Sequence, residues 1–270
     1  MIKAIKKMIP KKIKTFLRPH KVLLLPKKQE PFGKSTEVLG GMIAYNKHGG
    51  YFTPLSSQKN PAVQKIFSAK VFEPETVKFM IKNCGKGDII HAGTFFGDFL
   101  PGISNALAEG SKVWAFEPNV ENFRCAQITC LINNLKNVNL HNAGLGAHKT
   151  TVKMLVESET GIGLGGMSKI IHEPKKGRTI DVEINLIDEV IPQDRSISII
   201  QLDVEGYEKE ALSGALETIN RCKPIIILED NNKVIETSWF ADNILNMGYE
   251  ITGELHKNTL LTIKNIHSIK

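Results

Sequence analysis

From residue 86 onward, apolar residues gather in short unbroken runs that alternate with longer stretches of helical spacing. Such runs suit strands that are buried on both faces of a sheet. Their alternation with helices predicts an α/β fold with a mostly parallel sheet and helices on both sides. The strands expected on this basis are "DIIHA" (88–92), "KVWAFE" (112–117), "NVNLHNA" (137–143), "ISIIQLD" (197–203) and "PIIILED" (224–230).

Helices are expected between these strands, and further strands lie outside the main alternation. "TVKMLV" and "TIDVEINL" predict an added strand pair around the glycine-rich "TGIGLGGMS", and "YEITGEL" with "NTLLTIK" predicts a terminal antiparallel pair. Residues 29–60 carry five glycines without a sustained period, so we expect an irregular region there. The expected helices span about 62–82, with a break near Pro74, the stretch up to 109, 120–133 and 205–221.

The net charge of +7 is concentrated at the N-terminus. Residues 1–28 hold ten of the 35 basic residues and no acid, and the apolar residues at positions 2, 5, 9, 13 and 16 would form one stripe on a helix that Pro10 interrupts. This basic arm could lie on an anionic membrane surface, pack against its own domain or stay frayed. We expect no nucleic-acid partner, because the arm lacks interleaved aromatic residues and is poor in arginine.

Composition narrows the class of protein. A hydrophobic fraction of 41% is ordinary for a globular chain, and four cysteines without C-x-x-C pairs suggest neither a zinc site nor a disulfide framework. No apolar run approaches the roughly 20 residues that a membrane span needs, so we expect a cytoplasmic protein. The expected organisation is a basic arm and irregular region (1–60), a helical lead-in (61–85) and one α/β domain (86–270).

The turn after the first expected strand is a candidate ligand-binding loop, since ligands of open α/β sheets bind at the carboxyl ends of strands. Gly93 would allow a close backbone approach, and Gly97 would allow tight packing of the next helix. The turn lacks the G-x-G-x-x-G of dinucleotide-binding proteins, and Phe95 and Phe96 would crowd a pyrophosphate. His91, on the strand itself, is interpreted as a hydrogen-bonded core histidine.

The next two strand ends offer polar groups for a nucleoside. Glu117 stands where an acid can accept hydrogen bonds from ribose hydroxyls, although it could equally be a solvated acid before a helix that starts at Pro118. Asn142 and Ala143 could read an adenine edge, or Asn142 could be only a turn residue.

The most specific feature is "IIQLDVEGYEKEAL", in which a buried strand runs directly into Asp203, Glu205 and Glu208. Glu229 ends the neighbouring strand, so acids from two strands should converge at one sheet edge. Burial and mutual repulsion would raise the pKa of at least one of them and make it a candidate general base. The alternative is that Glu205 only favours a helix N-terminus and Glu208 faces water.

Taken in order, "GTFFGDF", "VWAFEPNVENF", "LINNLKNVNLHNAGLG", "INLIDEV", "IIQLDVEGYEKEALSGALETI" and "PIIILE" resemble the FkbM family of S-adenosylmethionine-dependent methyltransferases. The resemblance covers roughly residues 86–264. It implies a class I methyltransferase fold, which is a Rossmann-like, seven-stranded, mostly parallel sheet with a terminal antiparallel strand, here with an N-terminal extension. It also implies S-adenosylmethionine as cofactor and methylation of a hydroxyl, on a small molecule, a sugar or a glycan precursor.

The resemblance also assigns roles to individual residues. It implies that Asp203 lies near the reactive end of the cofactor, and it leaves Asp203, Glu205, Glu229 and His256 as candidate bases, with no metal site expected. His91 replaces the acid usual in the first strand, and Asp98 is a possible substitute for it. The residues that would contact the cofactor are Gly93, Thr94, Phe95, Phe96, Gly97, Asp98, Glu117, Pro118, Asn119, Asn142, Ala143 and Asp203.

Two other functions fit the same kind of sheet. A nicotinamide-dependent oxidoreductase would need the glycine-rich pyrophosphate turn that is missing here. A non-catalytic scaffold held at a membrane by the basic arm would need no cofactor at all. The variable segments, which are "TGIGLGGMS" and the first 85 residues, are expected to recognise the acceptor, because loops vary while the sheet is kept.

Overall fold

The computed structural model describes residues 39–264. The basic arm, residues 1–28, lies outside the described residues, so its predicted membrane contact stays a prediction. Within residues 39–264, no helix is long and apolar enough to cross a membrane.

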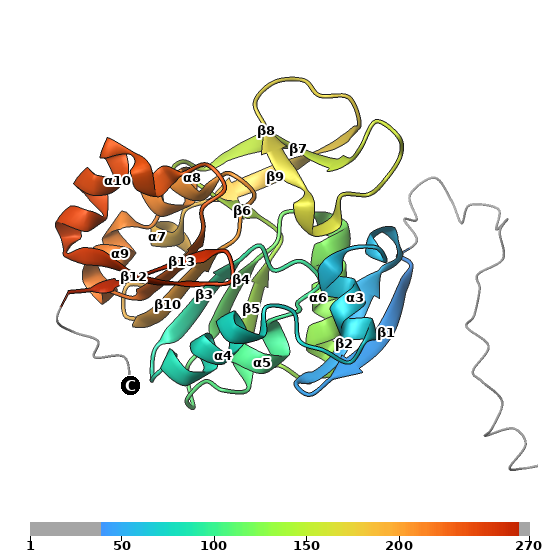
Figure 1. The fold of residues 1–270 in the computed structure, drawn as a ribbon, viewed down its shortest axis with the longest axis horizontal. Coiled ribbons are helices and arrows are strands. Elements are labelled where there is room, and N and C mark those ends of the chain that lie inside the picture. The colour runs from blue at the N-terminus through green and yellow to red at the C-terminus, as the bar shows by residue number, and fades with distance from the viewer. Residues whose placement is uncertain (1–38, 265–270) are drawn as a thin grey trace, which may run out of the picture. The chain divides into compact units, whose positions relative to one another are not determined.

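A seven-stranded sheet in the order β12-β13-β11-β10-β3-β4-β5 organises the fold (Figure 1). Strands β3, β4, β5, β10 and β11 run parallel, whereas β13 pairs antiparallel with β11. This confirms the predicted class I methyltransferase sheet with its terminal antiparallel pair. The strands span Asp88–Ala92 (β3), Val113–Phe116 (β4), Val138–His141 (β5), Ile197–Leu202 (β10), Ile225–Glu229 (β11), Tyr249–Leu255 (β12) and Asn258–Ile263 (β13).

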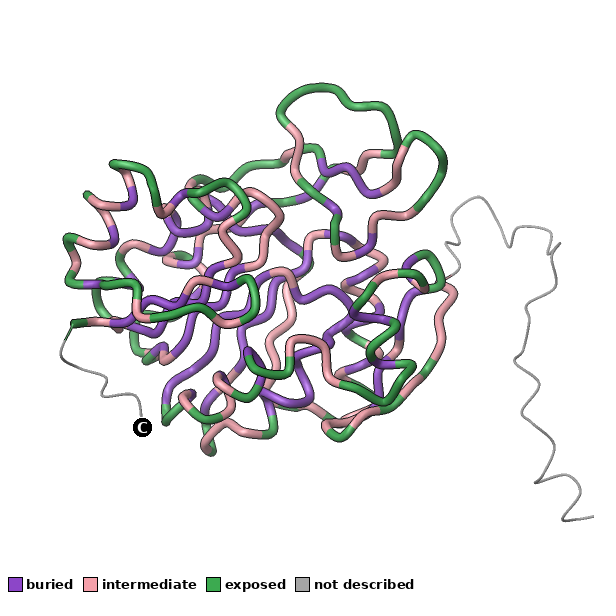
Figure 2. Tube along the Cα trace, in the orientation of Figure 1, coloured by how far each residue is buried: buried purple, intermediate pink, exposed green. Residues whose placement is uncertain are grey.

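Strand order reverses at β3, because the chain moves outward through β4 and β5 and then returns to β10 on the other side of β3. Such a reversal opens a crevice at the carboxyl ends of the two strands beside it. Figure 2 shows that the central strands are buried along most of their length. Their apolar side chains enter two core clusters, with Ile90 and Ile200 in one and Ile89 and Ile199 in the other.

Helices pack against both clusters. Apolar side chains of α8, α9 and α10 join the first cluster, and those of α4 and α5 join the second. The helices span Pro61–Phe67 (α3), Pro74–Asn83 (α4), Leu100–Ser104 (α5), Val120–Ile132 (α6), Ile187–Val190 (α7), Glu208–Ser213 (α8), Leu216–Cys222 (α9) and Ser238–Asn243 (α10). Single 3₁₀ turns lie at Leu55–Ser57 (η1), Gly165–Met167 (η2), Val234–Glu236 (η3) and Leu245–Met247 (η4).

Three expected helices are shorter or broken. The stretch 62–82 forms α3 and α4, which a turn ending at Pro74 separates, as the proline predicted. The helix expected up to residue 109 ends at Ser104. The helix expected over 205–221 divides into α8 and α9 at Gly214, where a Cβ would lie 2.0 Å from the carbonyl oxygen of Gly146. A close approach of two backbones therefore fixes this break.

The irregular region expected over 29–60 contains an antiparallel hairpin, β1 (Gly41–Asn46) with β2 (Gly49–Pro54). The glycines of this region predicted a loop, but two of them, Gly41 and Gly50, lie against aromatic side chains of the same hairpin. A Cβ at Gly50 would lie 2.6 Å from the ring of Tyr45, and one at Gly41 would lie 2.3 Å from the ring of Phe52. The hairpin also packs on α6, where the Thr129 hydroxyl accepts a hydrogen bond from the Phe52 amide at 3.1 Å.

The predicted additional strand pair is confirmed as part of a four-stranded sheet in the order β6-β9-β7-β8. Strands β7 and β9 pair antiparallel along most of their length. The turn η2 lies in the glycine-rich segment between β7 and β8. The strands span Gly144–Leu145 (β6), Thr150–Glu157 (β7), Lys169–Ile171 (β8) and Arg178–Asn185 (β9).

A buried ion pair fastens the amino ends of the central strands, at the opposite end of the sheet from the crevice. The Asp88 carboxylate accepts hydrogen bonds from Trp114 Nε1 at 2.8 Å, the Lys112 amide at 2.8 Å and Arg195 Nε at 2.7 Å. Asp88 is only 1% exposed, so its charge depends on these three donors.

We expect Asp88→Ala to lower the free energy of unfolding by about 3–5 kcal/mol, because it leaves Arg195 and two N–H groups without their acceptor. Urea unfolding at pH 7 measures the loss. Asp181→Ala is the matched control, since it removes an exposed ion pair with Lys153 and should cost less than about 1 kcal/mol. Equal losses in the two variants would contradict the role given to Asp88.

Candidate functional site

A cavity of about 460 Å³ opens at the carboxyl ends of β3, β10 and β11. This is the crevice that the reversal of strand order predicts. Its volume falls within the range of small-molecule sites in proteins. We call it the acidic cleft, because six carboxylates line it against the single lysine Lys257: those of Glu73, Asp98, Glu117, Asp203, Glu205 and Glu229.

The cleft perturbs the acidity of its own side chains. Burial raises the pKa of Asp98 to about 8, and the nearby charge of Glu73 contributes to the rise. Burial likewise raises the pKa of Glu205 to about 7, helped by the charges of Glu229 and Glu208. Carboxyl groups with near-neutral pKa are suited to proton transfer at physiological pH.

Asp203 and Glu229 form a coupled pair of carboxyl groups in this cleft. Burial, and next a hydrogen bond with Glu229, raise the pKa of Asp203 well above its usual value. Burial and the neighbouring carboxyl group of Glu229 therefore both disfavour the ionised form of Asp203. The expected convergence of acids from β10 and β11 is therefore present in the structure.

Four residues that line the cleft have left-handed backbone conformations. The φ angles are 42° at Glu73, 51° at Phe95, 52° at Glu205 and 61° at His256. Non-glycine residues adopt such angles rarely and at an energetic cost, and they cluster at binding and catalytic sites. Four of them around one cavity indicate a site whose side chains are held in place by the surrounding fold.

Glu117, at the end of β4, is buried rather than solvated. It is 5% exposed, and it accepts hydrogen bonds from the amides of Phe95 at 2.7 Å and Asn119 at 2.9 Å. Burial raises its pKa to about 7 despite these donors. Glu117 therefore fixes the turn after β3 and also presents its carboxyl group to the cleft.

Of the 15 predicted site residues, eight line the acidic cleft, one lines only a smaller adjoining cavity, and six line neither. The candidate bases Asp203, Glu205, Glu229 and His256 all line the cleft. The predicted cofactor contacts that line it, besides Asp203, are Gly93, Phe95, Asp98 and Glu117. Pro118 lines a smaller adjoining cavity. The six predicted residues that line neither cavity are Thr94, Phe96, Gly97, Asn119, Asn142 and Ala143.

Several of these six have structural contacts instead. Thr94 and Phe96 are fully buried, and Asn119 caps α6 by accepting a hydrogen bond from the Glu121 amide. Asn142 is exposed, and its side-chain amide donates to the carbonyl oxygens of Glu117 and Pro118. The alternative interpretation of Asn142 as a turn residue thus matches its contacts.

The adjoining cavity has a volume of about 40 Å³ and shares Gly93, Glu117 and Asp203 with the acidic cleft. Leu145, Met154 and Ile170 make its far side apolar. The glycine-rich segment 160–168 closes over it by two hydrogen bonds. Asn122 Nδ2 donates to the Gly165 carbonyl oxygen at 3.1 Å, and Asn119 Nδ2 donates to the Ser168 hydroxyl at 3.0 Å.

Sequence analysis missed some residues of the cleft. Glu73 precedes the helix α4 and carries no motif, and it enters the cleft because Asn258 and Thr76 hold its carboxylate. His91 was expected to be hydrogen-bonded in the core, and its Nδ1 does pair with Gln201 Oε1. However, its Nε2 is buried without a partner among the described residues, and the side chain lines the cleft.

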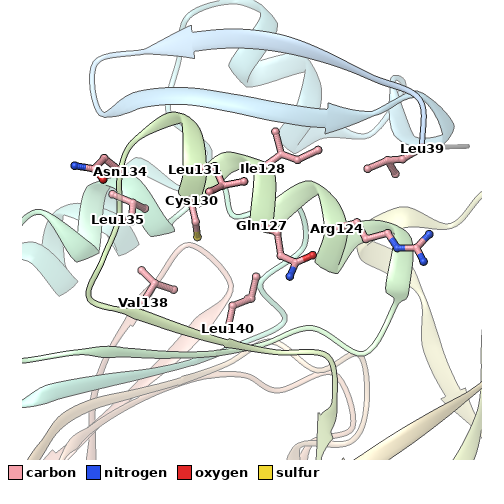
Figure 3. A pocket seen from close by; sticks show the side chains of 10 residues that line it. All are labelled: Leu39, Arg124, Gln127, Ile128, Cys130, Leu131, Asn134, Leu135, Val138 and Leu140. Carbon is pink, nitrogen blue, oxygen red and sulfur yellow. The ribbon is translucent and has the colours of Figure 1, made fainter.

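A second large cavity, of about 550 Å³, lies between α6 and β5 (Figure 3). Its lining is mostly apolar, including Ile128, Leu131, Leu135 and Leu140, and it contains no acid. Among the described residues, no group of three or more His, Cys, Asp or Glu side chains is arranged to hold a metal ion. The acidic cleft is therefore the part of the described chain where titratable groups gather around a cavity.

The raised pKa of Asp98 predicts how stability depends on pH. Between about pH 4 and pH 8 the folded protein binds a proton at Asp98 that the unfolded chain has lost, so the free energy of unfolding falls as pH rises through this window. Asp98→Asn should flatten this dependence and stabilise the protein at pH 8. Urea unfolding at pH 5, 6.5 and 8 tests this, with exposed Asp181→Asn as control. An unchanged slope in Asp98→Asn would refute the assignment.

The chain is similar to one protein family and to several solved structures. The model of the methyltransferase FkbM domain matches residues 83–260. A search of the curated proteins found no match. Among solved structures, the methyltransferase FkbM from Methylobacillus flagellatus KT is 20% identical with a TM-score of 0.47, over 66% of this chain and 43% of that one. This chain thus spans less than half the length of that relative.

Two further solved structures show the same general similarity. A SAM-dependent methyltransferase from Aquifex aeolicus is 16% identical, over 71% of this chain and 88% of that one, with a TM-score of 0.38. The tRNA (uracil-54, C5)-methyltransferase of Pyrococcus abyssi, in complex with S-adenosyl-L-homocysteine, is 11% identical, over 82% and 43%, with a TM-score of 0.40. On the match of the domain model to about two thirds of its residues, the chain belongs to the FkbM family of methyltransferases, whose cofactor is S-adenosylmethionine.

Proposed function

We propose that this protein transfers a methyl group from S-adenosylmethionine to a hydroxyl of a sugar or a glycan precursor. The observation that carries the proposal is the acidic cleft at the switch point of the sheet, where carboxyl groups of raised pKa surround a cavity of about 460 Å³. Family membership supplies the reaction class, and the cleft supplies groups able to bind a cation and accept a proton.

The residues of the cleft fit the cofactor at its methionine end. S-adenosylmethionine supplies a methyl group on a positively charged sulfur. A positive charge bound beside the six carboxyl groups of the cleft would favour their ionised form, and the ionised carboxylates would in turn attract it. We assign the ribose to Glu117. A carboxylate accepts about four hydrogen bonds, and the protein donors of Glu117 use three of these positions, which leaves one for a ribose hydroxyl.

Binding of the cofactor's adenine would require a change in segment 160–168. The apolar cavity beside Glu117 has only about 40 Å³, which holds little more than a water molecule. Segment 160–168 must rise from Asn119 and Asn122 to admit a base between Leu145 and Met154. Leu145 and Met154 then replace Asn142 and Ala143 as the proposed adenine contacts.

Glu205 is the proposed general base for the acceptor hydroxyl. It is half-buried, its backbone is held at a φ of 52°, and its pKa of about 7 leaves much of it ionised at neutral pH. When the acceptor oxygen is methylated, the Glu205 carboxylate would accept the hydroxyl proton, and the cofactor would leave as S-adenosylhomocysteine. Asp203 and Glu229, which are joined by a hydrogen bond, would orient the hydroxyl by further hydrogen bonds.

The acceptor class follows from the other groups in the cleft. The side chains of Phe72 and Phe95 offer flat apolar surfaces, while Glu229 and Asn231 accept hydrogen bonds. A sugar presents both an apolar face and several hydroxyl donors, so it matches this combination. His256 and Lys257, in the turn between β12 and β13, are exposed at the rim and would contact the remainder of a larger acceptor.

The direct test is transfer from methyl-labelled S-adenosylmethionine by the full-length protein to a panel of sugars and sugar nucleotides, detected by mass spectrometry. We expect Glu205→Gln to lower kcat about 10²- to 10⁴-fold with unchanged affinity for S-adenosylhomocysteine. In the wild type, kcat/KM should fall about tenfold per pH unit below pH 7, as Glu205 becomes protonated.

Glu210→Gln is the matched control, because this acid lies on α8 and does not line the cleft. Its activity should equal that of the wild type. Binding of NADH without a response to S-adenosylhomocysteine would favour an oxidoreductase and sink the proposal. Equal kcat values in Glu205→Gln and the wild type would leave methyl transfer in place but exclude Glu205 as the base.

A further inference from the structure

Glu73 presents a carboxylate oxygen to the acidic cleft that the fold itself does not use. It directly precedes Pro74, the first residue of α4, but its side chain does not cap that helix. Instead, Asn258 Nδ2 and Thr76 Oγ1 both donate hydrogen bonds to Oε2, at 2.9 Å and 3.1 Å. Oε1 has no donor among residues 39–264 and is not buried. Because Glu73 lines the cleft, Oε1 can accept a hydrogen bond from a ligand there.

Glu73 lies on the side of the cleft away from the proposed ribose site. Asn258, which holds it, begins β13 and is paired with Glu229 at the end of β11. Glu117 follows β4, which β10 and β3 separate from β11 in the sheet. Neighbouring strands lie about 4.8 Å apart, so three spacings put roughly 14 Å between the ends of β11 and β4. Glu73 therefore faces the part of the cleft that the acceptor would occupy.

The acids of the cleft lack counter-charges. None of the ion pairs found within residues 39–264 includes one of the six carboxyl groups that line the cleft. Lys257 is the one lysine in the lining, and it is exposed at the rim. S-adenosylmethionine carries a sulfonium, an ammonium and a carboxylate group, so it brings a single net positive charge. A cationic acceptor would supply charge that the acids still lack.

Phe72 gives the same corner of the cleft an apolar surface. It immediately precedes Glu73, is half-buried and also lines the cleft. An aromatic ring beside a carboxylate can receive the apolar face of a sugar and, next to it, a charged amino group. Both residues come before the segment 83–260 that matches the family domain. This corner is therefore supplied by the lead-in segment of the chain.

We propose that the acceptor is an amino sugar whose ammonium group binds Oε1 of Glu73 and whose apolar face lies on Phe72. The inference rests on the proposed function and narrows its acceptor class. An ammonium group has three N–H donors, and its hydrogen bond to a carboxylate is roughly twice as strong as a bond between neutral groups. Glu73 thus selects an amino sugar over the same sugar with a hydroxyl in place of the amino group.

Acceptors that differ at this one group test the assignment. Each sugar and sugar nucleotide of the panel is offered to the full-length protein in three forms: with a free amino group, with an N-acetylated amino group and with a hydroxyl. The N-acetylated form keeps an N–H donor but loses the charge. We expect kcat/KM of the wild type to be about tenfold or more higher for the free amine than for the other two forms, mainly through KM.

Glu73→Gln keeps an oxygen for Asn258 or Thr76 and removes the charge. We expect it to reduce the preference for the free amine to within about twofold, while the Kd of S-adenosylhomocysteine changes less than twofold. Glu75→Gln is the matched control, because this acid lies in the first turn of the same helix, is exposed and does not line the cleft. It should keep the preference of the wild type. Thermal unfolding shows whether each variant is folded during the assay.

The results separate this inference from the proposed function. Equal transfer by the wild type to the charged and neutral forms, or an undiminished preference in folded Glu73→Gln, would overturn the inference and leave methyl transfer to sugars in place. Weaker binding of S-adenosylhomocysteine by Glu73→Gln, in proportion to its loss of activity, would assign Glu73 to the cofactor and also overturn it. Absence of transfer to every form of every sugar by the folded wild type would overturn both.

Discussion

The close contact between the carboxyl ends of β3 and β10 determines the site. The Asp203 amide donates a hydrogen bond to the Ala92 carbonyl oxygen at 3.1 Å, and a Cβ at Gly93 would lie 1.8 Å from the Asp203 carbonyl oxygen. Only glycine allows the two strand ends to meet so closely, and its φ of 84° turns the chain toward α5. This contact places His91 beside Gln201 and sets Asp203 at the mouth of the crevice.

Several features of the acidic cleft lower the stability of the folded protein. Buried acids of raised pKa, four strained backbone conformations and a histidine nitrogen without a partner among residues 39–264 gather at this cavity. At the amino ends of the same strands, Arg195 neutralises the buried charge of Asp88. Such asymmetry is typical of proteins that keep a preorganised site on a rigid sheet. A cationic ligand would offset much of this cost, because it supplies the charge that the acids lack.

The sequence predicted the sheet well because its strands carry unambiguous signals. The unbroken apolar runs of β10 and β11 are typical of strands buried on both faces of a sheet. The "DVEGYE" and "FEPN" motifs placed acids at the carboxyl ends of two strands. Glycine was the main source of error. Glycines in β1 and β2 permit aromatic rings to approach the backbone closely, and Gly214 permits contact with Gly146. From the local sequence alone, however, the glycines of the hairpin predicted a loop, and Gly214 was predicted to lie within a helix.

The candidate site was predictable where its residues end strands and not where they arrive from elsewhere. Asp203, Glu205 and Glu229 follow directly from the ends of β10 and β11. Glu73, in contrast, is held in the cleft partly by Asn258, which is 185 residues away in sequence. The sequence could not predict that Nε2 of His91 has no partner among the described residues, because this depends on which ring nitrogen Gln201 contacts. Tertiary contacts of this kind leave no local pattern.

The central claim is that Glu117 and the acidic cleft bind S-adenosylmethionine. Its most direct test is calorimetric titration of S-adenosylhomocysteine into the full-length protein and into Glu117→Gln, which keeps an oxygen for the Phe95 or Asn119 amide but loses the charge that the ribose hydroxyls would meet. The account predicts binding to the wild type and an affinity at least about tenfold weaker in the variant. Equal affinities, or no binding to the folded wild type, would contradict it.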